Sequence, residues 1–129
     1  EKHGVADRID FREGDLYEPL RGEHLSYIVS NPPYISEDEW QQVPANVKNH
    51  EPAEALRGGP DGLLYLKRLI EGAAPLLRHP GQLVLEIAAS QEKSIIGLLN
   101  HAADLENAHV LPDHEKRPRV AIADRRSGR

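Results

Sequence analysis

The sequence predicts an α/β domain, and three observations support this fold class. Two short apolar runs, at 26–30 and 82–87, are typical of buried strands because they are rich in Ile, Val and Leu. Two longer segments, at 61–77 and 92–103, repeat their apolar residues at helical spacing. The last part of the chain, Glu106 to Leu111 and Arg119 to Ala123, is typical of an antiparallel strand pair.

The N-terminal part of the chain predicts the end of a helix followed by a strand. Gly4 is a natural helix stop. The alternation after it predicts a strand from Arg8 to Glu13, which Gly14-Asp15-Leu16 closes.

The run from Ser26 to Ile35 is the centre of the sequence. Ile28 and Val29 favour a strand that is covered on both faces. Pro32 and Pro33 lack an N–H and have a fixed φ, so the strand must end at Asn31. The two prolines therefore produce a stiff turn, which presents the Pro32 carbonyl, the Asn31 amide oxygen and the Tyr34 ring. Two acceptors and a ring can hold one planar NH2 group.

Several details of the remaining elements follow from single residues. Ser36 and Glu39 predict the capped start of a helix, and Pro75 predicts a shortened last turn in the helix at 61–77. His79-Pro80-Gly81 predicts a break before the strand at 82–87. Within that strand Glu86 has two interpretations, a carboxylate that lines a site or a partner for a nearby Arg or backbone N–H.

The motif Asn31-Pro32-Pro33-Tyr34 resembles motif IV of S-adenosylmethionine-dependent methyltransferases that modify amide or exocyclic amino nitrogens. The segments after it occur in the order typical of the protein-(glutamine-N5) methyltransferases that act on peptide-chain release factors. These segments are Glu51-Pro52, Ala55-Leu56, Gly58-Gly59, Asp61-Gly62 and Leu83 to Glu86. One departure is Ala88, where the family usually has Gly.

The resemblance implies a partial class I, Rossmann-like fold, with a mostly parallel sheet and an antiparallel C-terminal strand. Residues 1–129 then form the C-terminal part of a single methyltransferase catalytic domain, without the first strands and the glycine-rich cofactor loop. We therefore expect this chain alone to bind the cofactor weakly or not at all and to be inactive. In this fold the strand at 9–13 pairs with an upstream strand, so we also expect an unpaired edge. Such an edge leads either to pairing with another chain, and so to self-association, or to disorder of the strand.

The resemblance also assigns roles to individual residues. Asn31, Pro32 and Tyr34 are the catalytic residues, and Pro33 and Glu51 join them in binding the substrate. Asp15 and Leu16 contact the adenine of S-adenosylmethionine, and Asn31 also belongs to the cofactor-binding set; the alternative for Asp15 is a turn cap. The loop Gln41 to Pro60 is either a lid over a peptide substrate or a disordered insert.

Composition narrows the choice of partner and location. A net charge of −5 disfavours binding through phosphate neutralisation, so we expect a release factor and no direct nucleic acid as partner. No apolar run approaches a membrane span, there is no cysteine, and the seven histidines lack metal-ligand spacing. We therefore expect a cytoplasmic protein without a metal.

Two alternatives to methylation of a release factor stay open. The same four-residue motif can hold the amino group of a flipped base, which predicts a nucleic-acid N6-adenine or N4-cytosine methyltransferase. The second alternative is a truncated, non-catalytic fragment that only binds a partner.

Overall fold

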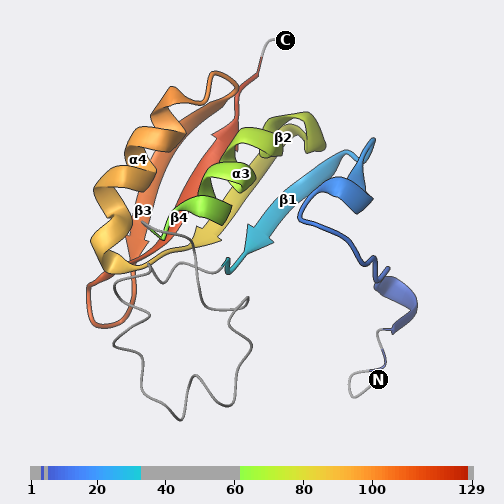
Figure 1. The fold of residues 1–129 in the computed structure, drawn as a ribbon, viewed down its shortest axis with the longest axis horizontal. Coiled ribbons are helices and arrows are strands. Elements are labelled where there is room, and N and C mark those ends of the chain that lie inside the picture. The colour runs from blue at the N-terminus through green and yellow to red at the C-terminus, as the bar shows by residue number, and fades with distance from the viewer. Residues whose placement is uncertain (1–3, 5, 33–61, 128–129) are drawn as a thin grey trace.

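The computed structural model describes residues 4, 6–32 and 62–127, and its elements follow the order that the sequence predicts from residue 25 onward (Figure 1). The strands and α-helices are β1 (Leu25–Ser30), α3 (Leu64–Ala73), β2 (Leu77–Glu86), α4 (Glu92–His101), β3 (Leu105–Pro112) and β4 (Pro118–Arg125). Short 3-10 turns span Ala6–Arg8, Glu18–Leu20, Ala74–Leu76 and Ala89–Gln91. The predicted helix at Ser36, the predicted lid Gln41 to Pro60, and the site residues Pro33, Tyr34 and Glu51 lie outside the described residues.

The four strands form one mixed sheet in the order β1-β2-β4-β3. β1 and β2 pair in parallel, while β4 is antiparallel to both of its neighbours. This arrangement confirms the predicted antiparallel C-terminal strand, while one of the three strand pairs in the described sheet is parallel. β1 ends at Ser30, so the predicted exit of the backbone at Asn31 is also confirmed.

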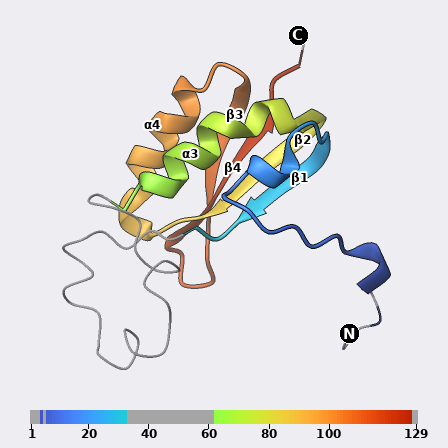
Figure 2. The ribbon, with the colours of Figure 1, turned by 45° about the vertical axis from the view of Figure 1, so that its right-hand side comes forward.

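Both α-helices cover the same face of the sheet, so the described part of the chain has two layers (Figures 1 and 2). The core lies between the layers, where Leu66 of α3, Leu83 and Leu85 of β2 and Ile95 of α4 have no exposed surface. Gln91 is the one buried polar residue of the described part. Its side chain accepts from the Ala88 N–H and donates to the Gly62 carbonyl, which satisfies both ends of the amide.

The opposite face of the sheet is not covered by any described helix. Ile28 of β1 is buried against the helices, but its neighbours Tyr27 and Val29 are 63% and 71% exposed. The prediction that β1 is covered on both faces is therefore wrong for the described part of the chain. The reason is that α3 and α4 pack on one side only, and alternate residues of a strand point to opposite faces.

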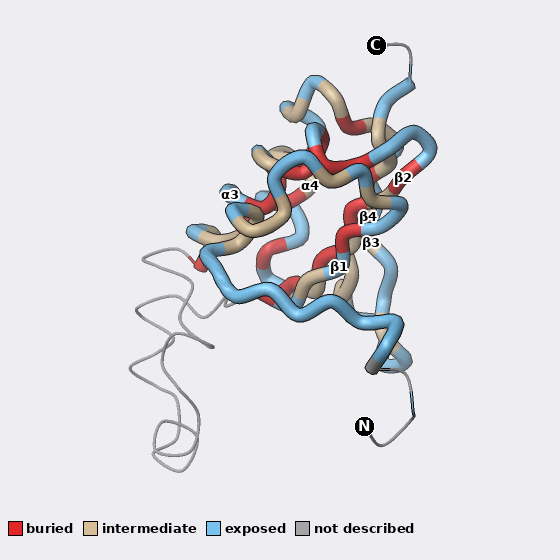
Figure 3. The backbone as a smooth tube through the Cα atoms, turned by 90° about the vertical axis from the view of Figure 1, so that its right-hand side faces the viewer, coloured by how far each residue is buried: buried red, intermediate tan, exposed pale blue. Residues whose placement is uncertain are grey.

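The predicted strand from Arg8 to Glu13 is wrong. The stretch has no strand pairing, and Figure 3 shows the chain ahead of β1 as largely exposed. Phe11 is 84% exposed, and Ile9 is 48% exposed. A strand needs a hydrogen-bonded neighbour, and the described residues offer none there. The described sheet therefore has β1 and β3 as its two edge strands, and self-association through an edge stays a prediction.

The connection into β2 differs from the predicted break. α3 ends at Ala73 and passes into a 3-10 turn that contains Pro75, which confirms the shortened last turn. β2 then begins at Leu77, earlier than predicted, and its pairing with β1 is irregular between Leu77 and Gln82. A Cβ at Gly81 would meet the Arg78 carbonyl and lie 3.1 Å from the Ser26 carbonyl oxygen. Glycine is therefore what permits the close approach of the two strands.

Candidate functional site

An open cavity of about 560 Å³ lies where β1 and β2 end. Asn31 follows the carboxyl end of β1, and Glu86 is the last residue of β2. Arg119 reaches the same place because β4 is antiparallel and pairs Val120 with Glu86. In open α/β sheets, ligands bind outside the carboxyl ends of the parallel strands. This cavity is therefore the best candidate for the functional site among the described residues.

Asn31 and Pro32, the two residues after β1, differ in their exposure to solvent. Asn31 is exposed and lines the cavity, whereas Pro32 is buried. Among the described residues, no hydrogen bond is made to the Asn31 side chain or to the Pro32 carbonyl. The Asn31 side chain is therefore available to an external donor in the cavity, whereas Pro32 is not among the residues that line it. That these two oxygens hold an NH2 group stays a prediction.

An ion-pair network forms one wall of the cavity. The Arg119 guanidinium lies 3.3 Å from a carboxylate oxygen of Glu86 and 3.6 Å from one of Asp113. Both interpretations of Glu86 are thus met, because its carboxylate lines the cavity and has an Arg partner. The side chains of Arg119 and Glu86 keep 43% and 35% of their surface exposed, so the network faces the cavity from a partly solvated position.

Asp113 is held by the turn between β3 and β4. Its Oδ1 accepts the backbone N–H groups of Glu115 and Arg117 at 2.8 and 3.1 Å. These bonds, with the N–H of Arg117 as the largest cause and the charge of Arg119 as a further one, lower the pKa of Asp113. The carboxylate is therefore ionised at neutral pH and fixed beside Arg119.

Asp15 and Leu16, the residues expected to contact the cofactor, line a separate cavity of about 440 Å³ between the stretch ahead of β1 and α3. Asp15 forms an ion pair of 2.8 Å with Arg68, and 60% of its side chain is exposed. Leu16 has a φ of 50° and packs partly against the core. A free carboxylate oxygen beside an apolar side chain fits the amino group and ring of an adenine. This cavity is not lined by Asn31 or Pro32.

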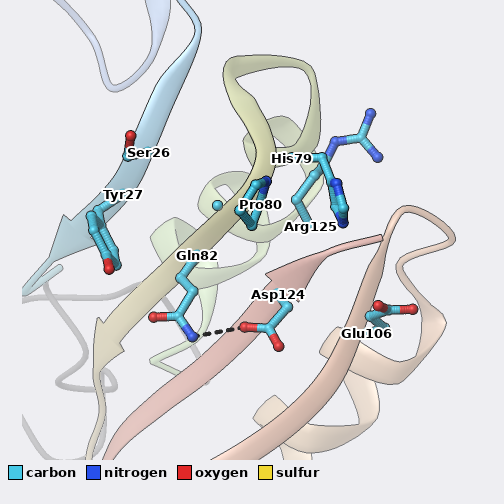
Figure 4. A pocket seen from close by; sticks show the side chains of 9 residues that line it. Ser26, Tyr27, His79, Pro80, Gln82, Glu106, Asp124 and Arg125 are labelled. Atoms are coloured by element: carbon cyan, nitrogen blue, oxygen red, sulfur yellow. Dashed lines mark hydrogen bonds between the residues drawn. The ribbon is translucent and has the colours of Figure 1, made fainter. Parts of the chain in front are cut away.

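A third cavity, of about 540 Å³, lies at the other end of the sheet (Figure 4). Ser26 and Tyr27 line it from the start of β1, so it is at the amino end of the parallel strands. The Gln82 amide donates to Asp124 at 2.8 Å, and Asn107 donates to the second oxygen of the same carboxylate. The central polar groups are thus paired within the protein, and these bonds lower the pKa of Asp124.

Of the predicted residues, Asn31 lines the cavity and Pro32 does not. The sequence missed Arg119 and Asp113, which also line it. Their place beside Asn31 depends on the register between β2 and β4, which no local pattern encodes. The one available signal was the interpretation of Glu86 as the partner of an Arg. Within the described ranges no cluster of His, Asp and Glu could hold a metal ion, and no helix has the length and apolarity to cross a membrane.

The mixed sheet with its two helices is an α/β fold, consistent with part of a Rossmann-like methyltransferase. No family model matches the chain. Curated relatives named release factor glutamine methyltransferase do match: that of Moorella thermoacetica is 43% identical over 97% of the chain. Those of Cereibacter sphaeroides and Bacillus anthracis are 40% and 36% identical over 93% of it.

The chain belongs to the release factor glutamine methyltransferase family and matches the C-terminal portion of its members. It covers 44% of the length of the Moorella thermoacetica relative and 43% of that of the Bacillus anthracis relative.

Proposed function

We propose that the protein carrying this chain transfers a methyl group from S-adenosylmethionine to the side-chain amide nitrogen of a glutamine in a peptide-chain release factor. The names of the relatives support the class of substrate. The single structural observation that carries the proposal is the open Asn31 amide at the carboxyl end of β1. The location that follows is the cytoplasm, where translation takes place.

The chemical task is to activate a poor nucleophile. The lone pair of an amide nitrogen is delocalised into its carbonyl group, so the nitrogen must be oriented before it can attack. The Asn31 amide oxygen and the Pro32 carbonyl each accept one N–H of the acceptor and leave the remaining electron density of the nitrogen facing the methyl group. This is catalysis by positioning and preorganised electrostatics.

The remaining predicted residues complete the acceptor site. Tyr34 stacks on the plane of the acceptor amide and excludes water, and Pro33 stiffens the turn. Glu51 contributes to binding of the peptide substrate. These roles follow from the family resemblance, and we propose them for the full-length protein.

S-adenosylmethionine supplies a sulfonium-bound methyl group as the electrophile. Asp15 would accept a hydrogen bond from the adenine amino group, and Leu16 would pack against the ring. The amide nitrogen would form a bond to the methyl carbon as the carbon–sulfur bond breaks. The sulfur would keep that electron pair and leave as the thioether S-adenosylhomocysteine, and the proton lost by the nitrogen would pass to water.

A methyl-transfer assay with three acceptors tests the proposal. The full-length gene product is incubated with tritiated S-adenosylmethionine and, separately, with release factor, DNA or RNA. Label in the release factor, located by mass spectrometry on a glutamine side chain, is the expected result. Label only in a nucleic acid would replace the proposal by the amino-methyltransferase alternative, and no label in any acceptor would favour a non-catalytic binding protein.

A further inference from the structure

We propose that Arg119 binds the carboxamide oxygen of the acceptor glutamine and thereby fixes the other end of the group that Asn31 and Pro32 hold. This inference rests on the proposed function and adds to it a residue that is outside the Asn-Pro-Pro-Tyr motif. It assigns the start of β4 to the acceptor site.

The backbone places Arg119 firmly beside the end of β2. Its carbonyl oxygen accepts the N–H of Ile87 at 2.9 Å, just beyond the last residue pair of the β2–β4 ladder. Arg119 and Asn31 both line the 560 Å³ cavity. A residue from the second half of the chain thus faces the same space as the turn that follows β1.

The side chain is held without using all of its donors. One terminal nitrogen of Arg119 bonds to Glu86, and its Nε faces Asp113 at 3.6 Å. A guanidinium group carries five N–H donors in a fixed plane. Among the described residues, the second terminal nitrogen has no hydrogen-bond partner. Arg119 is therefore both oriented by two carboxylates and able to donate to a ligand in the cavity.

The chemistry of the acceptor matches this donor. A carboxamide presents two N–H donors on its nitrogen and an acceptor on its oxygen. Asn31 and Pro32 satisfy only the nitrogen end. Arg119 is the one Arg or Lys among the described residues that line the cavity. Val29, Val84 and Val120 supply apolar surface there, and a hydrogen bond to a charged group is stronger beside apolar surface than in water.

A purely structural role for Arg119 makes a different prediction. If the residue served only to neutralise Glu86 and Asp113, its replacement would weaken the binding of every acceptor equally. If it binds the carboxamide oxygen, its replacement would weaken only acceptors that have this oxygen. The two roles can therefore be separated with an acceptor that lacks the amide.

The experiment uses the full-length gene product and two forms of release factor, one with its methylated glutamine and one with that glutamine replaced by methionine. The methionine side chain is similar in length to that of glutamine but has no carbonyl oxygen. Titration calorimetry measures the Kd of each form with the wild type and with Arg119→Gln. We expect Arg119→Gln to raise the Kd of the glutamine form by about 10- to 100-fold, the effect of losing a charged hydrogen bond. The Kd of the methionine form is expected to change less than about twofold.

Arg126→Gln is the matched control. Arg126 also pairs with a glutamate, at 3.7 Å from Glu106, and its side chain is 46% exposed, close to the 43% of Arg119. It lies beyond the far end of β4 and does not line the cavity. We expect it to leave both Kd values unchanged.

The outcomes are decisive in both directions. A selective loss for the glutamine form supports the inference, and an equal loss for both forms, or no loss, overturns it. Should Arg119→Gln fail to fold, Arg119→Lys is used instead, and a several-fold selective loss is expected because lysine keeps the charge but not the planar fork. A wild type that methylates no release factor would refute the proposed function, whereas a wild type that methylates it, with no selective effect at Arg119, would refute only this inference.

Discussion

The Tyr17 hydroxyl donates a hydrogen bond of 2.7 Å to the backbone carbonyl of Leu69 and so joins the segment ahead of β1 to α3. The ring of Tyr17 lies against Gly72, where a Cβ would come within 2.7 Å of it. Burial raises the pKa of Tyr17, so the phenol keeps its proton and remains a donor. This contact holds Asp15 and Leu16 in place beside α3.

Tyr17→Phe is expected to lower the free energy of unfolding of the full-length protein by about 1 kcal/mol, because the bond to the Leu69 carbonyl is lost. Urea denaturation measures the change. Tyr27→Phe is the control, since Tyr27 is 63% exposed and should stay within about 0.5 kcal/mol of the wild type. Equal effects of the two substitutions would contradict the importance of the Tyr17 contact.

Gly81→Ala is expected to destabilise the protein by at least about 1 kcal/mol, because a new Cβ meets the Arg78 and Ser26 carbonyls between β1 and β2. Gly97→Ala is a matched substitution in α4, where nothing lies within 4 Å of the new Cβ. It should be neutral or stabilise by up to about 1 kcal/mol, owing to helix propensity. Thermal unfolding of both variants tests this difference in sign.

Leu85→Ala is expected to cost about 2–5 kcal/mol, since Leu85 has no exposed surface and its loss leaves a cavity beneath the helices. Val29→Ala on the opposite face of the sheet should cost much less in the described part, because Val29 is 71% exposed there. A large loss at Val29 in the full-length protein would show that another segment covers this face.

Asp113→Asn tests the ionised carboxylate beside Arg119. The pKa of Asp113 is lowered in the folded state, so its ionised form stabilises the protein above the ordinary value of 3.8. This contribution is lost as the pH falls through the lowered pKa. The wild type should therefore be more stable than the variant at pH 7, and the difference should shrink below about pH 4. Denaturation at several pH values, with exposed Asp7→Asn as control, measures it.

Asn31→Ala in the full-length enzyme is expected to lower kcat by about 10²-fold, the usual cost of one lost preorganised hydrogen-bonding group. The stability of the protein should hardly change, because Asn31 is exposed. Asn100→Ala, on the exposed side of α4, serves as the control. Unchanged turnover of Asn31→Ala would remove Asn31 from the mechanism.

Much of the fold could be predicted because local chemistry controls it. The two prolines end β1 at Ser30, Pro75 ends α3, and the alternation near the C-terminus produces the β3–β4 pair. The prediction of a strand from Arg8 to Glu13 was wrong because a strand depends on a non-local partner. An alternating pattern forms a strand only when a neighbouring strand is present to pair with it.

The sequence by itself determined where the chain leaves β1, because Pro32 fixes φ and lacks an N–H directly after Asn31. Only the tertiary structure decided which residues line the cavity together with Asn31. Glu86, Asp113 and Arg119 meet beside Asn31 through the register of β2 with β4, and register depends on the packing of the whole sheet against α3 and α4.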